Sequence, residues 1–134
     1  MTIVVDASVA AKWALQENAS DRARALLDSD EDFIAPSLIV AEIGSALWKR
    51  AVRQDMSTRD AVRALQSAVR LLTQLVPPTE LAARATEIAV DLRHPIYDCF
   101  YLALAERERC ALITADAKLI AAAKVVRGVE VRRL

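Results

Sequence analysis

The chain has 134 residues, a length that predicts one domain with room for a hydrophobic core. Hydrophobic residues make up 54% of it and charged residues 27%, a composition that excludes a disordered chain. Lys and Arg together number 18, as do Asp and Glu, so the formal net charge is zero and no global basic field draws in nucleic acid. A nucleic-acid partner has to be held by local groups.

Cysteine, histidine and hydropathy patterns narrow the class of protein further. Cys99 and Cys110 make no disulfide framework and are expected to be reduced, and the single histidine, His94, excludes zinc-type Cys/His spacing. The first residues, "MTIVVDAS", reach an acid too soon for a signal peptide, and no stretch has transmembrane length. We expect a cytoplasmic protein without membrane contact.

Strand and helix patterns alternate along the chain. In order, the sequence predicts a strand at 2–5, a helix from a Ser8 cap to 16, a helix at 19–30, a strand at 33–36, helices at 37–54 and 57–72, a strand at 73–78, helices at 79–93 and 95–109, a strand at 111–114, a helix at 116–124 and a strand at 129–134. This alternation predicts an α/β fold, with a mostly parallel sheet flanked by helices, as a single domain over residues 1–134. With only two glycines, the chain has no glycine-rich phosphate loop.

Four acids stand alone in apolar segments: Asp6, Glu42, Asp98 and Asp116. A carboxylate in such surroundings needs a partner, because its desolvation is costly. Each acid also has an ordinary structural interpretation. Asp6 can end a strand in a turn, Asp116 can cap a helix, Asp98 can meet the positive end of a helix dipole, and Glu42 can lie at a helix rim.

The positions of these acids favour a shared site. Asp6 and Asp116 each follow an apolar strand, with Ser8 and Thr114 two residues away, and the carboxyl ends of parallel strands are where ligands bind. Clustered carboxylates repel unless a cation neutralises them, and an all-oxygen set suits Mg²⁺ or Mn²⁺. Such ions activate water and stabilise charge on a phosphoryl group. The residues therefore predict a metal-dependent phosphoryl-transfer enzyme, a hydrolase.

The ordered segments "VVDASV", a lone Glu in an apolar helix, "YDCFYLALAE" and "LITAD" resemble those of PIN-domain ribonucleases, in particular the VapC toxins of type II toxin–antitoxin systems. The resemblance covers essentially the whole chain and implies a three-layer α/β/α domain. It implies metal ligation by the four acids, with Ser8 and Thr114 completing the catalytic set by orienting waters or carboxylates. The implied activity is endonucleolytic hydrolysis of RNA by activated water with Mg²⁺ or Mn²⁺. One departure is "AERERC", where many relatives have a glycine between helix and strand.

The same resemblance implies an RNA substrate, a cognate antitoxin and a homodimer. Candidate RNA contacts are two basic clusters on helices, which comprise Arg59, Arg63 and Arg70, and Lys49, Arg50 and Arg53. We interpret His94 as part of a helix-start segment. Trp13 and Trp48 are interpreted as core or interface residues, beside which an apolar groove could accept an antitoxin segment.

Other functions remain open on the sequence alone. One alternative is a PIN-domain RNA-processing nuclease outside a toxin system. Another is a catalytically silent RNA- or protein-binding module on the same fold. A haloacid-dehalogenase-like phosphatase would need Asp-x-Asp after the first strand, where this chain has Asp6-Ala7-Ser8, and the paired acids of a response-regulator receiver are not evident.

Overall fold

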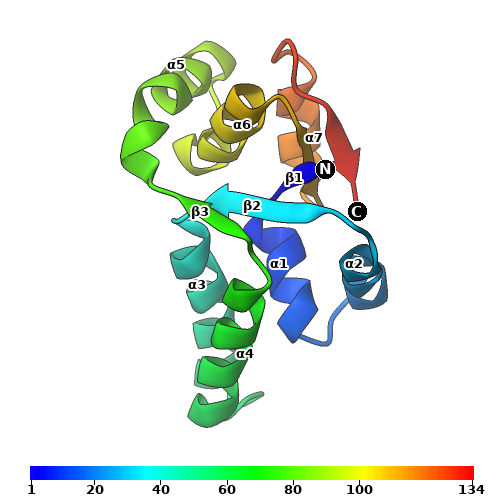
Figure 1. Cartoon of the computed structure of the whole chain (residues 1–134). Helices are drawn as coiled ribbons and strands as arrows, with labels where there is room; N and C mark the ends of the chain where they lie inside the picture. The colour runs from blue at the N-terminus through cyan, green and yellow to red at the C-terminus, as the bar shows by residue number, and fades with distance from the viewer.

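A computed structural model describes residues 1–134 and contains one five-stranded sheet in which every neighbouring pair of strands is parallel. The strand order is β3-β2-β1-β4-β5 (Figure 1). The strands are β1 (Thr2–Val5), β2 (Asp32–Pro36), β3 (Gln74–Val76), β4 (Ala111–Thr114) and β5 (Val131–Arg133). The first strand therefore lies in the middle, and the chain builds outward on one side before it crosses to the other.

Helices cover both faces of this sheet, so the fold is the three-layer α/β/α arrangement that the sequence predicts. The helices α1 to α4 lie on one face, and α5 to α7 lie on the other (Figure 1). They are α1 (Ala7–Ala14), α2 (Ser20–Ala25), α3 (Ile39–Val52), α4 (Thr58–Arg70), α5 (Ala82–Leu92), α6 (Ile96–Glu108) and α7 (Ala117–Ala123), with 3₁₀ turns at Leu26–Asp28 and Pro78–Glu80. None of these helices is both long enough and apolar enough to cross a membrane.

The core forms where the central strands meet α6. Val4 and Val5 of β1 and Leu112 of β4 are fully buried, as expected for β-branched and aliphatic residues in a sheet covered on both faces. On α6 an unbroken run from Tyr101 to Ala105 is buried, because this helix lies between the sheet and α5. Helix α6 thereby packs against β1, β2 and β4 on one side and against α5 on the other.

Local structure differs from the sequence prediction at a few helix ends. Helix α1 is capped by Asp6, whose side chain accepts a hydrogen bond from Val9 N, so the predicted Ser8 cap is wrong by two residues. The helix predicted over 19–30 ends at Ala25 and tightens into a 3₁₀ turn. Arg109 ends α6 with φ 52°, a left-handed conformation that glycine adopts more easily. A glycine is therefore the residue that this turn favours.

Candidate active site

Asp6 and Thr114 meet at the carboxyl edge of the sheet because their strands are neighbours, with Val5 paired to Ile113. The Thr114 hydroxyl donates to Asp6 Oδ2, and the Ser8 hydroxyl donates to Oδ1 over 2.6 Å. Val9 N also donates to Oδ1, over 3.2 Å. Ser8 Oγ in turn accepts from Ala115 N over 3.0 Å, which ties the start of α1 to the loop after β4. Both oxygens of Asp6 are thus fixed in direction.

Burial makes the charge of Asp6 costly. The residue is only 6% exposed, and burial raises its pKa above the ordinary value, with a smaller increase from the negative charge of Asp98. Hydrogen bonds from Ser8, Thr114 and Val9 act in the opposite direction, because they stabilise the charged form. The hydrogen bonds therefore hold the Asp6 carboxylate in one orientation, although burial makes its charged form less favourable.

Glu42 approaches from α3 and is held by α6. The buried Tyr101 hydroxyl donates to Glu42 Oε1 over 2.6 Å, which joins residues that lie 59 positions apart in the chain. Burial raises the pKa of Glu42, the Tyr101 hydrogen bond opposes this shift, and the charges of Asp6 and Asp98 add to it. Burial also raises the pKa of Tyr101 strongly, so this phenol remains a proton donor to the carboxylate.

Asp98 lies in the first turn of α6 and has a partner that the sequence interpretation missed. His94 Nε2 lies 2.6 Å from Asp98 Oδ2, and the His94 and Asp98 side chains are 12% and 27% exposed. The interpretation of His94 as only a helix-start segment is therefore incomplete. Because His94 lies two residues before α6 begins, helical spacing gave no signal of this contact. The charge of Asp98 raises the pKa of both Asp6 and Glu42, so three of the four acids share one electrostatic environment.

Asp116 is placed differently. Its side chain caps α7 by accepting from Lys118 N over 2.9 Å, which is the structural role that the sequence left open. Its own backbone N donates to the Thr114 hydroxyl over 3.0 Å. Asp116 therefore joins the site through Thr114 and is absent from the charges that shift the pKa of Asp6 or Glu42.

The donor chemistry of the site fits a hard divalent cation. No three His, Cys, Asp or Glu side chains are gathered closely enough to form a ready metal-binding cluster. Each carboxylate instead accepts hydrogen bonds from protein donors, while one oxygen of Glu42, of Asp98 and of Asp116 accepts none. Carboxylate oxygens without a protein donor suit Mg²⁺ or Mn²⁺, which prefer oxygen ligands, and the mutual repulsion of Asp6, Glu42 and Asp98 favours a bound cation. Binding requires these side chains to turn toward one point.

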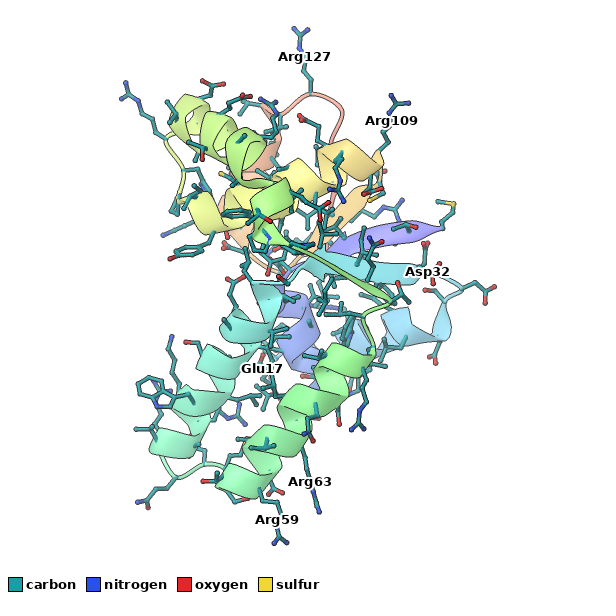
Figure 2. The ribbon with its side chains drawn as sticks, turned by 60° about the vertical axis from the view of Figure 1, so that its left-hand side comes forward. Glu17, Asp32, Arg59, Arg63, Arg109 and Arg127 are labelled. Carbon is teal, nitrogen blue, oxygen red and sulfur yellow. The ribbon has the colours of Figure 1, made fainter.

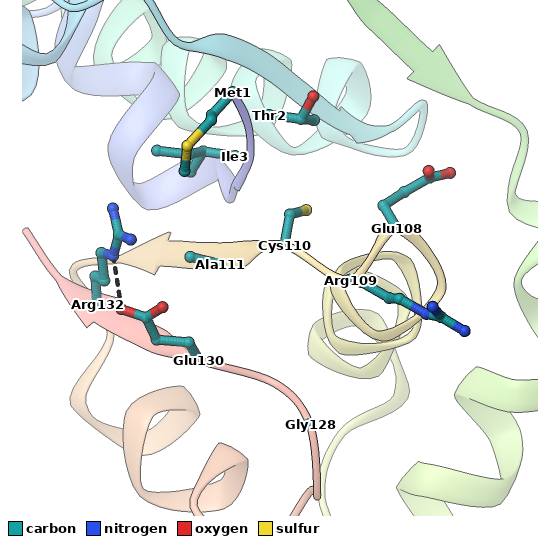
Figure 3. A pocket seen from close by; sticks show the side chains of 10 residues that line it. All are labelled: Met1, Thr2, Ile3, Glu108, Arg109, Cys110, Ala111, Gly128, Glu130 and Arg132. Carbon is teal, nitrogen blue, oxygen red and sulfur yellow. Dashed lines mark hydrogen bonds and ion pairs between the residues drawn. The ribbon is translucent and has the colours of Figure 1, made fainter.

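Two other regions lie apart from the acids. A hollow of about 440 Å³ opens at the amino ends of β1 and β4, between Met1, Cys110 and Arg132, and contains none of the four acids (Figure 3). Arg59 and Arg63, two of the candidate RNA contacts, lie at the far end of α4 and point away from the sheet (Figure 2). The structure therefore separates this basic stripe from the acid site.

Known proteins resemble this chain in sequence over most of its length. The PIN domain family matches residues 3–125. Ribonuclease VapC9 of Mycobacterium tuberculosis is 39% identical over 117 residues, 87% of either chain, and ribonuclease VapC3 of Pyrobaculum aerophilum is 28% identical over 121 residues, 89% of this chain and 92% of the other.

Among solved structures, a chain of the Rickettsia felis VapBC2 complex bound to a promoter DNA fragment superposes with a TM-score of 0.74 at 13% identity, and covers 100% of this chain and 99% of its own. VapC20 of M. tuberculosis, described as a toxin that cleaves the sarcin–ricin loop, superposes with a TM-score of 0.69 at 22% identity, over 90% of this chain and 94% of its own. These two likenesses show the shared fold.

Proposed function

The chain belongs to the PIN-domain family, among the VapC-like proteins, and from this premise we propose that it is an endoribonuclease that acts in the cytoplasm as the toxin of a toxin–antitoxin pair. The observation that carries the proposal is the group of Asp6, Glu42 and Asp98 on three separate elements, each within electrostatic reach of the others. Relatives that are named ribonucleases support the substrate class. The three carboxylates need a positive charge to offset their mutual repulsion. Hydrolysis of a phosphodiester also needs a positive charge to offset the negative charge on the phosphate.

The proposal includes a Mg²⁺ or Mn²⁺ ion held by the carboxylates of Asp6, Glu42, Asp98 and Asp116. When bound, such an ion activates water and offsets negative charge on the phosphodiester. The chain's own donors prepare the ligands. Ser8 and Thr114 fix Asp6, Tyr101 fixes Glu42, and His94 fixes Asp98. Because both Ser8 and Thr114 donate to Asp6, they act as orienting groups and not as nucleophiles.

A cleavage assay with matched variants tests the activity. We expect the purified protein to cut RNA with Mg²⁺ or Mn²⁺ and to stop when EDTA is added. Glu42→Gln should remove most of the activity, because it keeps the size of the side chain and deletes a metal-binding charge. Asp91→Asn, an exposed acid on α5, is the control and should cleave like wild type. In a preparation shown to be free of contaminating nuclease, cleavage that Glu42→Gln and EDTA leave unchanged would reject the mechanism.

An apolar groove between α3 and α4 supports the proposed antitoxin partner. It has a volume of about 430 Å³ and is lined by Leu47, Val62 and Leu65, with the 62% exposed Trp48 at its side. An amphipathic helix or extended segment of an antitoxin fits such a surface. Structures of related toxin–antitoxin complexes support the same proposal. Trp13, in contrast, is a core residue whose indole donates to Ala23 O over 2.9 Å.

Expression in cells tests the partner. We expect the chain alone to arrest growth and the small protein encoded beside it to relieve the arrest. Trp48→Gln should weaken that rescue while cleavage by the free enzyme is unchanged, since Trp48 lines the α3–α4 groove and makes no hydrogen bond to any of the four acids. Harmless expression of active, folded enzyme would reject the toxin role without rejecting the nuclease. The proposed homodimer is tested by sedimentation of the purified protein.

A further inference from the structure

A cleft of about 400 Å³ leads away from the acid site between α1 and α3. Among the five larger hollows of the molecule, it is the only one lined by any of the four acids. Ser8 and Glu42 lie at one end, and the other lining residues include two lysines, Lys12 and Lys49. The cleft therefore joins the proposed catalytic carboxylates to a source of positive charge.

Helical spacing explains how the two walls arise. On α3 the lining residues Glu42, Ser45, Ala46 and Lys49 follow the i, i+3, i+4, i+7 pattern of a single face. On α1 the residues Ser8, Ala11 and Lys12 follow the same rule. A rise of about 1.5 Å per residue places Lys12 about 6 Å beyond Ser8 along its helix, and Lys49 about 10 Å beyond Glu42. The side chains between these positions, Ala11, Ser45 and Ala46, are small and leave the cleft open.

The far end of the cleft carries an excess of positive charge. Lys12 Nζ lies 3.2 Å from Glu17 Oε1, and Arg50 Nη1 lies 3.9 Å from Glu17 Oε2, so one acid is shared by two cations. Lys49 is exposed and has no ion-pair partner. Of the charged residues that line the cleft, Glu17 is shared by Lys12 and Arg50, and Glu42 lies at the acid end, so Lys49 is left as the positive charge without a partner. Because the chain as a whole has no net charge, this local excess stands out as a place for an anion.

We propose that this cleft holds the sugar–phosphate backbone of single-stranded RNA next to the cleaved bond, with Lys12 contacting the nearer phosphate and Lys49 the next one. The proposal rests on the nuclease function above and adds its substrate path. The walls of the cleft are the two adjacent helices α1 and α3, and the small residues Ala11, Ser45 and Ala46 lie between them. Contacts of this kind position the substrate without reading its sequence. Lys12 was not singled out in the sequence, because a lysine four residues before the polar segment at residues 16–18 has nothing unusual about it.

Binding measurements as a function of salt test the proposal. Lys12→Met and Lys49→Met are compared, alone and together, with the double variant Arg59→Met/Arg63→Met, which deletes two exposed charges at the far end of α4. RNA affinity is measured by fluorescence anisotropy in an Asp116→Asn background, where cleavage is suppressed and the α7 cap is kept. Steady-state cleavage is measured in the otherwise wild-type chain.

Each lost phosphate contact should lower the slope of log K against log salt by about 0.7. If variant and wild type bind RNA equally at 1 M salt, the Kd of a single lysine variant at 0.1 M salt should be about fivefold that of wild type. The Kd of the double lysine variant should be about 25-fold that of wild type. KM should rise in parallel while kcat is kept, because the contacts bind substrate and transition state equally. The Arg59/Arg63 control should show neither effect. Melting curves check folding, and Lys49→Met, which breaks no ion pair, carries the test if Lys12→Met is unstable.

An unchanged Kd and salt slope in the lysine variants would overturn the proposal. So would loss of antitoxin affinity without loss of RNA affinity, because the cleft would then belong to a protein partner. Failure of the proposed function has a different signature, namely a wild-type protein that binds RNA through both lysines but cleaves none.

Discussion

The hydrogen bond from Tyr101 to Glu42 gives the sharpest test of how the site is held. Tyr101→Phe removes one hydroxyl and keeps the ring, so the packing of α6 against the sheet is preserved. The residue is 1% exposed and its hydroxyl donates to Glu42 Oε1 over 2.6 Å. The substitution therefore leaves a half-buried carboxylate without its only protein donor.

The expected cost follows from the strength of a hydrogen bond to a charged group, about 1.5–3 kcal/mol. Because Glu42 keeps some contact with water, we expect a loss of unfolding free energy around or just below the lower end of that range, about 1–2 kcal/mol at pH 8. Unfolding entropy of about 2.1 cal/mol/K per residue converts this loss into a melting temperature lower by about 4–7 °C for a chain of 134 residues.

The pH dependence separates a charged hydrogen bond from lost packing. The folded-state pKa of Glu42 is raised by burial, so its protonation adds stability as the pH falls through that raised pKa toward the ordinary value of 4.5. Tyr101 holds this pKa down, so the variant should have a higher Glu42 pKa and gain more on acidification. The difference in melting temperature between wild type and Tyr101→Phe should therefore be largest at pH 8 and shrink as the pH approaches 4.5.

Circular dichroism melts in EDTA at several pH values measure both quantities. Tyr97→Phe is the matched control, since the chain has only two tyrosines and Tyr97 is 64% exposed without a hydrogen bond. It should melt like wild type at every pH. A Tyr101→Phe deficit that is the same at all pH values, or no deficit at all, would refute the assignment of a charged hydrogen bond.

Most RNA cleavage should be lost in each of four single variants, Asp6→Asn, Glu42→Gln, Asp98→Asn and Asp116→Asn, and double variants should lose little more than single ones. If the loss of initial rate in a double variant equalled the product of the two single losses, the result would argue against one shared site. In EDTA at pH 8, Asp6→Asn should be more stable than wild type by about 1 kcal/mol, because it deletes a buried charge and keeps the α1 cap. Added Mn²⁺ should raise the melting temperature of wild type only, and a less stable variant in EDTA would contradict this account. His94→Ala should weaken Mn²⁺ binding about tenfold by calorimetry, with partial recovery in His94→Gln, since His94 orients Asp98.

The sequence was most informative where a charged residue stands in an otherwise apolar segment. Lone acids at strand ends and in apolar helices were visible without coordinates, and so was the alternation that produces a parallel sheet. The contacts that hold those acids were not visible. Tyr101 meets Glu42 across 59 residues, and only the packing of α6 between the sheet and α5 brings them together.

Charge patterns on helices were harder to interpret correctly. Arg59 and Arg63 form a regular basic stripe, yet they lie far from the acids, whereas Lys12 and Lys49 line the same cleft from two different helices. Periodicity identifies one face of one helix, but a cleft between helices depends on how they pack. Asp98 shows the same limit, since its partner His94 lies just before the helix and became visible as a partner only through side-chain geometry.

The placement of β1 beside β4 has a consequence for the order in which the protein becomes active during synthesis. The bonds that fix Asp6 come partly from Thr114, which is made 108 residues later. Asp6, Glu42 and Asp98 therefore all exist in the growing chain before the strand that orients the first of them. Closing so long a loop costs entropy and comes late in folding. On the proposed nuclease function, a nascent chain on the ribosome would lack an assembled site until the strand that carries Thr114 has left the exit tunnel and inserted beside β1.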